Sequence, residues 1–143
     1  MGELAQAVAV VASGLFAGAA LYITVAEHPA RMECGTTLAA TVFGPSYRRA
    51  AAMQASLAVI GTLAGVLSWL LGGGGEWLGA ALVLFFVVPF TFVAIMATNR
   101  RLLDPGLDRG SAEARALLAR WGRLHAVRTV AGAVSFFVFV WAA

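Results

Sequence analysis

Aromatic, imidazole and guanidinium side chains share one face of the last apolar segment. Trp121, His125, Arg128 and Gly132 are separated by four, three and four residues, the spacing of one side of an α-helix. Only 15 uncharged residues follow Arg128, about 22 Å of helix, whereas the hydrocarbon core of a bilayer is about 30 Å thick. Either the bilayer thins here, or Arg128 and His125 lie inside the membrane boundary. Ionisable groups at that depth usually face a bundle interior, so this face predicts a buried pocket where an imidazole can exchange protons near neutral pH.

Polar residues of the other apolar segments are expected to reach the same level of the membrane. They are Glu27 and His28 after the first segment, Gln54 about two turns into the second, and Asn99 and Arg100 after the third. The predicted pocket therefore combines a carboxylate, two imidazoles, two amides and guanidinium groups, with Glu27 as a candidate partner of Arg128. Single residues have ordinary alternatives, because Trp121 also suits a membrane interface and Glu27 can simply pair with another arginine.

Composition indicates that the elements carrying these residues are membrane-spanning helices. Hydrophobic residues make up 61% of the 143-residue chain. Charged residues make up only 12%, against about 25% in an average soluble domain. We expect a single domain over residues 1–143, with spans at about 4–27, 46–71, 77–100 and 124–142. The predicted fold class is all-α: an integral membrane four-helix bundle whose last helix is long, with an amphipathic cytoplasmic extension.

Prolines and one serine predict where the helices bend or end. Pro29 predicts a corner after His28, followed by a connection over residues 30–44. Pro45 suits the first turn of the second helix, where a missing N–H costs nothing. Pro89 predicts a kink near the middle of the third helix, and Ser111 suits the amino-terminal cap of the last helix.

The arginines predict the orientation in the membrane. All ten basic residues are arginine, three between the first and second spans and seven between the third span and the last apolar run. These two connections lie on the same side of a four-span protein, so the positive-inside rule predicts that this side is cytoplasmic and that both termini lie outside, in the inner or plasma membrane. Basic residues that flank spans are ordinary topogenic signals, so the expected surroundings are membrane lipid, with no nucleic-acid partner.

Five segments carry a pattern that extends over nearly the whole chain. They are residues 14–22 (GLFAGAALY), 27–31 (EHPAR), 89–91 (PFT), 98–100 (TNR) and 120–128 (RWGRLHAVR). The pattern resembles the family of small four-helix membrane proteins that includes the anthrone oxygenases, and its most specific parts are the W-x3-H-x2-R element and Asn99. The resemblance implies a membrane-embedded, monooxygenase-like oxidoreductase that converts a hydrophobic, electron-rich aromatic of the anthrone type into a quinone.

The resemblance also implies roles for the residues of the pocket. His125 would take the proton from the anthrone carbon acid, and Arg128 and Asn99 would stabilise the developing enolate oxygen. The substrate-binding candidates are Trp121 and Tyr22, which would stack on a flat substrate entering from the lipid, together with Gln54 and Glu27. The carbanion formed in this way reacts with dioxygen itself, so this route uses no cofactor.

Two alternatives remain open at the level of sequence. Glu27, His28 and His125 make up a two-histidine, one-carboxylate set, the ligand composition of non-haem iron oxygenases, and imidazole also suits copper. An unwound corner at Pro29 would be needed to aim the two adjacent residues at one ion. The other alternative is a non-enzymatic membrane protein whose polar pocket binds a lipid or a small hydrophobic ligand.

Overall fold

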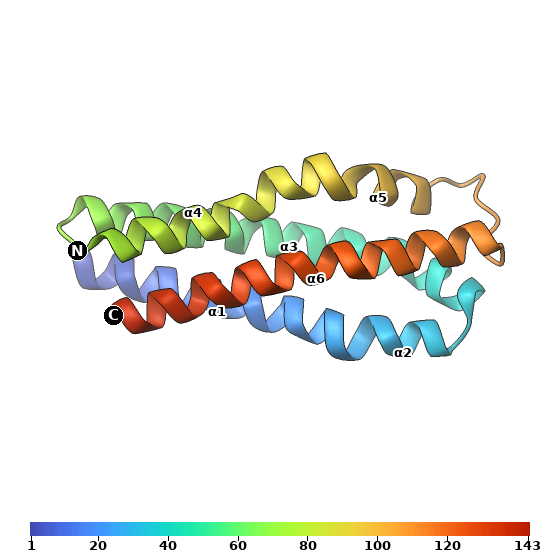
Figure 1. The fold of residues 1–143 in the computed structure, drawn as a ribbon, viewed down its shortest axis with the longest axis horizontal. Helices are drawn as coiled ribbons and strands as arrows, with labels where there is room; N and C mark the ends of the chain where they lie inside the picture. Colours follow the sequence, from blue (N-terminus) through green and yellow to red (C-terminus); the bar gives the residue numbers. More distant parts are fainter.

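The computed structural model describes all residues, 1–143, and contains helices and no strands (Figure 1). The elements in chain order are α1 (Gly2–Tyr22), η1 (Ile23–Glu27), α2 (His28–Glu33), α3 (Thr36–Leu70), α4 (Gly75–Phe90), η2 (Thr91–Ile95), α5 (Met96–Leu102) and α6 (Ala112–Ala142). The elements η1 and η2 are π-helical turns that continue the helices before and after them. The predicted all-α class is confirmed.

The elements form a bundle of four long antiparallel rods. The rods are α1–η1–α2, α3, α4–η2–α5 and α6, and around the bundle α1 packs on α3, α3 on α4, α4 on α6 and α6 on α1. Both termini lie at the same end (Figure 1). All four rods, Gly2–Glu33, Thr36–Leu70, Gly75–Leu102 and Ala112–Ala142, are long and apolar enough to cross a membrane. The chain is therefore an integral membrane protein.

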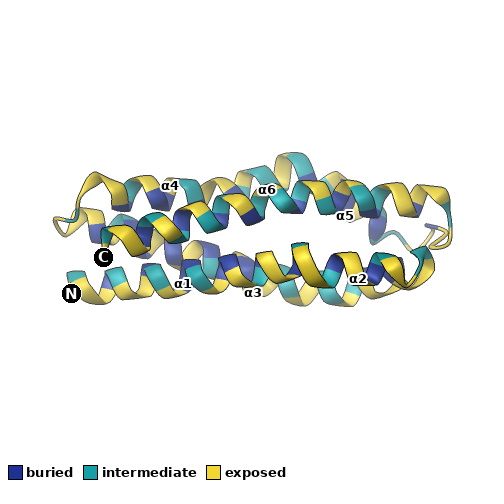
Figure 2. Ribbon diagram, turned by 60° about the horizontal axis from the view of Figure 1, so that its bottom comes forward, coloured by how far each residue is buried: buried dark blue, intermediate teal, exposed yellow.

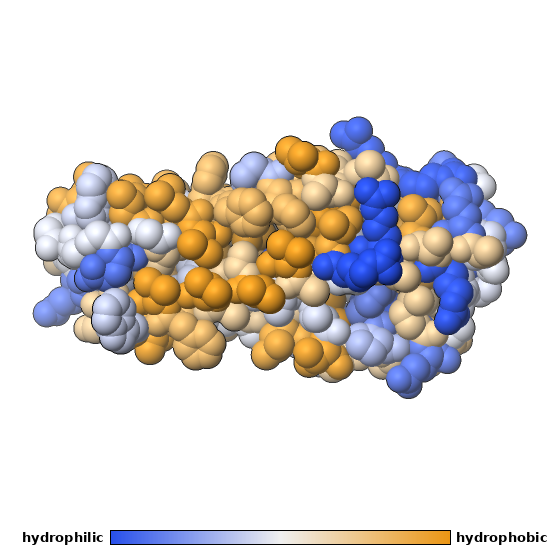
Figure 3. Space-filling model, viewed as in Figure 1, coloured by the Kyte–Doolittle hydropathy of each residue, from blue (hydrophilic) through white to orange (hydrophobic).

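Apolar side chains cover the outside of the bundle as well as its interior. Exposed positions, yellow in Figure 2, follow the outer faces of all four rods, and Val93, Phe137 and Trp141 are among the most exposed apolar residues. Figure 3 shows apolar side chains across the middle of one face and hydrophilic side chains gathered at the end formed by α2 and α5. This outward apolar surface is the one that lipid tails solvate.

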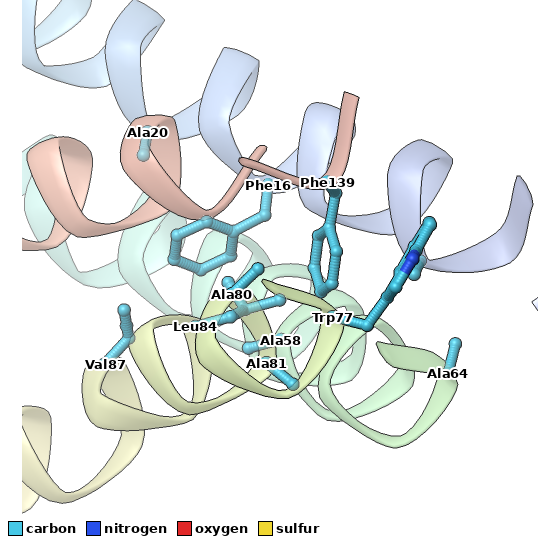
Figure 4. Close-up of a cluster of buried hydrophobic side chains, with 11 residues drawn as sticks. Phe16, Ala20, Ala58, Ala64, Trp77, Ala80, Ala81, Leu84, Val87 and Phe139 are labelled. Atoms are coloured by element: carbon cyan, nitrogen blue, oxygen red, sulfur yellow. The ribbon is translucent and has the colours of Figure 1, made fainter. Parts of the chain in front are cut away.

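Two apolar clusters fill the interior, one towards each end. In the cluster nearer the termini, Phe16, Trp77 and Phe139 fill the space left by small residues such as Ala58 and Ala81 (Figure 4). The other cluster includes Phe43, Ile95, Leu118 and Trp121, and lies towards the hydrophilic end. The polar residues of the site lie between and beside these clusters, so their positions are held by packed side chains on both sides.

The predictions at Pro29 and Pro45 were wrong. The first rod continues through Pro29, which is at the start of α2, and α3 begins at Thr36, so Pro45 lies inside it and no connection extends over residues 30–44. Proline removes one helical N–H, but a membrane helix tolerates the loss because neighbouring helices and local π-helical adjustments compensate for it. Only Cys34 and Gly35 separate α2 from α3, where Gly35 has φ 94°, a conformation that favours glycine.

The two π-helical turns each lie close to a proline. In η1 the N–H of His28 donates to the carbonyl of Ile23, and in η2 the N–H of Met96 donates to that of Thr91, so each bond spans five residues. Pro29 follows η1, and Pro89 precedes η2. Prolines break the regular ladder, and a π-helical turn is one way to restore hydrogen bonding around the break. The kink predicted at Pro89 is therefore accompanied by a widened turn, η2.

The connection before α6 is held by side chains at the hydrophilic end. The Ser111 hydroxyl accepts from the Ala114 N–H and caps α6, as the sequence predicts. The Arg101 guanidinium donates to Glu113 at 2.7 Å and to Asp104 at 2.6 Å, which links α5 to the start of α6. The Gly106 N–H and the Arg101 guanidinium stabilise the ionised Asp104 carboxylate and lower its pKa.

Candidate functional site

A small cavity lies where the predicted polar residues meet. Its lining comes from η1, α2, α3 and α6: Ile23, Arg31, Phe43, Ser46, Tyr47, Ala50, Ala51, Gln54, Trp121, His125 and Arg128. Its volume is about 20 Å³, which is room for one water molecule. The structure therefore brings His125, Arg128, Trp121 and Gln54 together around one space.

His125 is fixed by an aromatic wall and a threonine. Its ring stacks on Trp121 with centroids 4.7 Å apart, and Trp121 meets Phe43 edge-on at 5.3 Å. The imidazole Nδ1 lies 3.1 Å from the Thr24 hydroxyl, and only 2% of His125 is exposed. The π-helical turn η1 carries Thr24, so α1 and α6 together set the orientation of this imidazole. The spacing of four along α6 that the sequence shows is what stacks Trp121 on His125.

Arg128 pairs with an amide instead of a carboxylate. Its Nη2 donates to Gln54 Oε1 at 2.8 Å, and its guanidinium carbon lies 5.8 Å from the centre of the Phe16 ring. Because an arginine only donates, the Gln54 oxygen must face it, and the orientation of the amide is fixed. Gln54 Nε2 and Arg128 Nε are buried donors without a protein partner. Buried donors of this kind stabilise an acceptor that enters the site.

Glu27 is not the partner of Arg128, and of the two predicted possibilities the structure shows the pairing of Glu27 with another arginine. Glu27 accepts hydrogen bonds from Arg31, one helical turn further on, and from the Ser46 hydroxyl at 3.0 Å. Arg31 also lies 3.3 Å from Ser46 and is 7% exposed. Glu27 thus neutralises the buried Arg31 guanidinium, because a buried charge without a partner is strongly destabilising. Through Arg31 and Ser46 this group forms the wall of the cavity towards the hydrophilic end.

Asn99 does not line the cavity but contacts Tyr47, which does. Its Nδ2 donates to the Tyr47 hydroxyl at 3.1 Å, and Tyr47 stacks on Phe43 with ring centroids 5.5 Å apart. Asn99 is 1% exposed and its Oδ1 has no partner. Tyr47 therefore takes the place next to the cavity that the sequence analysis expected of Asn99. Sequence reasoning missed Tyr47 because it was expected at the very start of the second helix, whereas α3 begins at Thr36 and Tyr47 lies well inside it.

Tyr22 does not join the site. It is 58% exposed and lines no part of the cavity. The buried positions of the first rod include Ala20 and Ile23, and Tyr22 follows Ala20 by two residues, about 200° around the helix. Tyr22 therefore does not lie with the other predicted substrate-binding residues, because its side chain faces outward from the bundle.

The proposed metal ligands do not converge either. The Glu27 carboxylate binds Arg31 and Ser46, while His28 packs against Trp121 with ring centroids 5.2 Å apart and lies against Gly122. The structure contains no group of three or more His, Cys, Asp or Glu side chains placed to hold a metal ion. The two-histidine, one-carboxylate alternative does not fit, because the unwound corner that it required at Pro29 is a continuous helix.

A larger, mainly apolar cavity adjoins the first. It lies between α3 and the α4–η2 rod, has a volume of about 160 Å³, and is lined by Tyr47, Ala51, Gln54, Ala55, Ala58, Val87, Val88, Thr91, Phe92, Met96 and Arg128. Tyr47, Ala51, Gln54 and Arg128 line both cavities and form the wall between them. Phe92 is 64% exposed on the apolar exterior, so this second cavity lies at the lipid-facing side of the bundle.

Fold and site together define a class of protein: an integral membrane four-helix bundle with an aromatic-lined polar pocket between its helices. The chain belongs to the anthrone oxygenase family, whose sequence model matches residues 43–138. That range includes the five cavity-lining residues Tyr47, Gln54, Trp121, His125 and Arg128, and also Asn99 behind them. The membership indicates an oxygenase-like role.

Two curated relatives bear the same family name. The anthrone oxygenase tpcL of Aspergillus fumigatus is 29% identical over 137 residues, which cover 89% of this chain and 85% of the relative. The anthrone oxygenase gedH of Aspergillus terreus is 42% identical over 60 residues, 38% of this chain and 40% of the relative. No solved structure gives a significant match to the chain.

Proposed function

We propose that this protein oxidises a flat, hydrophobic, electron-rich carbon acid of the anthrone type to the corresponding quinone, using dioxygen and no cofactor. The observation that carries the proposal is the arrangement around the first cavity. A buried imidazole, His125, lies beside an Arg128–Gln54 pair that retains unused hydrogen-bond donors. The names of both curated relatives support the substrate class.

The first step is proton transfer to His125. The methylene hydrogen of an anthrone is acidic because its loss gives an enolate conjugated with the aromatic rings. The hydrogen bond of the His125 ring is made at Nδ1, so a lone pair on Nε2 can accept that proton. A positioned general base of this kind contributes about 10²–10⁴-fold in rate.

The second role is to stabilise the anion that results. The enolate oxygen accepts hydrogen bonds from the Arg128 guanidinium and from Gln54 Nε2, the buried donors beside His125. Asn99 acts as a positioning residue, because it holds the Tyr47 hydroxyl at the edge of the same space. Glu27 keeps Arg31 neutralised in the cavity wall.

The remaining chemistry uses dioxygen as the oxidant. The carbanion carbon forms a bond to dioxygen, and protonation by the imidazolium of His125 gives a hydroperoxide at that carbon. Loss of the second hydrogen from the same carbon and of hydroxide from the peroxide then yields the quinone carbonyl and one water molecule. One oxygen atom enters the product, the other leaves as water, and His125 returns to its neutral form.

The substrate enters from the lipid through the second cavity. A three-ring substrate does not fit the first cavity, which has room for one water molecule. The apolar cavity of about 160 Å³ adjoins the first cavity on its lipid-facing side. Binding therefore requires the Tyr47 and Gln54 side chains in the dividing wall to move aside, so that the aromatic rings lie in the apolar part and the reacting carbon near His125.

The test is quinone formation from an anthrone by the protein purified in mild detergent. Absorbance follows the quinone, an oxygen electrode follows the dioxygen consumed, and the expected stoichiometry is one to one above the spontaneous rate. We expect His125→Gln to lower kcat by about 10²–10⁴-fold with an unchanged thermal unfolding temperature. Arg120→Ala, an exposed position one turn away, is the matched control and keeps its activity.

Two results would count against the proposal. Full activity in His125→Gln removes His125 from the chemistry. Saturable binding of the anthrone by the wild-type protein without any turnover supports the alternative of a protein that binds a hydrophobic ligand.

A further inference from the structure

We infer that Thr24 and Thr129 are positioning residues, which hold His125 in the tautomer with its proton on Nδ1 and leave Nε2 as the free base. The inference rests on the proposed function for its catalytic consequence, although the tautomer itself can be measured without any turnover. It follows from counting the protons in a chain of hydrogen bonds between α1, η1 and α6.

The chain of hydrogen bonds ends at two backbone carbonyl groups. Thr129 Oγ1 lies 3.2 Å from the carbonyl oxygen of Ala20 and 3.2 Å from that of His125. Carbonyl oxygens only accept hydrogen bonds, and a threonine hydroxyl has a single proton. The Thr129 proton is therefore directed to these carbonyls, and its oxygen is left to accept.

The middle of the chain is the contact between the two hydroxyl groups. Thr24 Oγ1 and Thr129 Oγ1 are 2.7 Å apart, so one of the two hydroxyls donates to the other. Because the Thr129 proton is used at the carbonyls, Thr24 donates and Thr129 accepts. The single proton of Thr24 is then used, and its oxygen can only accept from a third group.

That third group is His125. Its Nδ1 lies 3.1 Å from Thr24 Oγ1 and must carry the hydrogen of this contact. The opposite direction, in which Thr24 donates to Nδ1, would draw the Thr129 proton towards Thr24. Thr129 would then face two carbonyl oxygens at 3.2 Å with no proton between them, an unfavourable contact of lone pairs in a site without bulk water.

The packing of the first rod against α6 makes this chain of hydrogen bonds possible. Thr129 follows His125 by one helical turn on α6, and both are buried at 7% and 2% exposure. Thr24 is the second residue of the π-helical turn η1, on the rod that packs on α6. Free imidazole in water favours the other tautomer, with the proton on Nε2, so the chain would hold His125 in the form that it does not adopt by itself.

The experiment is nitrogen-15 NMR of histidine-labelled protein in detergent micelles, where two-bond proton couplings distinguish the two tautomers. His28 and His125 are the only histidines, so His125→Gln assigns the signals and His28 serves as an internal reference. We expect a protonated Nδ1 and an unprotonated Nε2 for His125 in the wild-type protein. Thr24→Val and Thr129→Val should each shift it to the Nε2–H form, whereas Thr24→Ser should retain the wild-type tautomer.

Thr98→Val is the matched control. Thr98 is a buried threonine whose hydroxyl has no partner, so this variant should leave the His125 signals unchanged. An Nε2–H form in the wild-type protein, or the wild-type tautomer in both valine variants, overturns the inference. The wild-type spectrum alone decides the tautomer if a valine variant fails to fold.

Kinetics then connect the tautomer to the reaction. Thr24→Val should lower kcat about 10–100-fold with little change in KM, because removing the partner that orients a histidine has effects of about this size, and Thr24→Ser should restore it. An unchanged kcat in Thr24→Val with an altered tautomer overturns the positioning role. If the wild-type protein shows the Nδ1–H form but no anthrone turnover, the tautomer assignment stands and the proposed function fails.

Discussion

Gln54 has two roles at the level of single residues, and substitution can separate them. Its oxygen accepts from Arg128, while its Nε2 is a buried donor without a partner. Gln54→Leu should leave the guanidinium without its acceptor and destabilise the protein by about 1–3 kcal/mol. Gln54→Glu keeps an acceptor for Arg128, so the unfolding temperature should stay close to that of the wild type. Because it replaces the donor by a negative charge next to the enolate, it should still lower kcat/KM strongly.

Thermal unfolding in detergent and the anthrone assay together check this pair. Equal losses of stability in both variants would show that shape, and not the acceptor, is what Gln54 contributes. Wild-type kcat/KM in Gln54→Glu would remove the Nε2 donor from the stabilisation of the enolate.

Sequence reasoning identified the residues of the site that share a helix face. Trp121, His125 and Arg128 follow the helical repeat of one segment, so their meeting needs only local geometry. Tyr47 and Thr24 could not be found in this way, because their places depend on where α3 begins and on a π-helical turn. The pairing of Arg128 with Gln54 instead of Glu27 also depends on tertiary structure, since Arg31 is one turn from Glu27 and neutralises it first.

Two of the glycines test the packing between helices. A Cβ at Gly65 on α3 would lie 2.6 Å from the Phe139 ring and 3.0 Å from Ala81, whereas a Cβ at Gly18 on α1 meets nothing within 4 Å. Gly65→Ala should therefore destabilise the bundle by about 1–3 kcal/mol through overpacking. Gly18→Ala, the matched control, should be neutral or slightly stabilising. Thermal unfolding of both variants checks the expectation, which fails if their unfolding temperatures agree.

The cavity between α3 and η2 provides a test of substrate entry. Ala55 and Ala52 are both exposed alanines of α3, but only Ala55 lines this cavity. Ala55→Phe should fill the space near the lipid and raise KM for an anthrone with little change in stability. Ala52→Phe should behave as the wild type. Steady-state kinetics over a range of anthrone concentrations distinguishes them, and an unchanged KM in Ala55→Phe would rule out this route.

The helices themselves could be predicted from the length of the uncharged segments, but their ends could not. Apolar length is set by the thickness of the bilayer, so four long helices were predicted and four are found. Proline rules come largely from soluble helices, where Pro45 would end or start an element. In this bundle α3 continues through Pro45, because a helix packed between neighbouring helices tolerates the hydrogen bond that proline removes.

Most arginines of the molecule lie on the helices towards the end that holds the α2–α3 and α5–α6 connections. The predicted orientation places this end in the cytoplasm, and Cys34, an exposed free thiol between α2 and α3, reports on it. We expect a membrane-impermeant maleimide to label Cys34 in inverted vesicles and not in intact cells. Cys34→Ser is the control for other reactive groups, and rapid labelling from outside intact cells would reverse the assigned orientation.

The π-helical turns η1 and η2 have a consequence for how such a bundle can change over generations. Each contains one residue more than a regular helical turn needs, so in the coding sequence it amounts to a single additional codon. Deleting one residue within η1 would restore an ordinary helix in which α1 and α2 keep nearly the same faces towards the bundle, because the wider turn is what accommodates the additional residue. Within the narrowed turn Thr24 would leave His125, while the apolar lengths of the helices barely changed. A one-codon deletion could thus keep a membrane-inserted bundle and remove its chemistry.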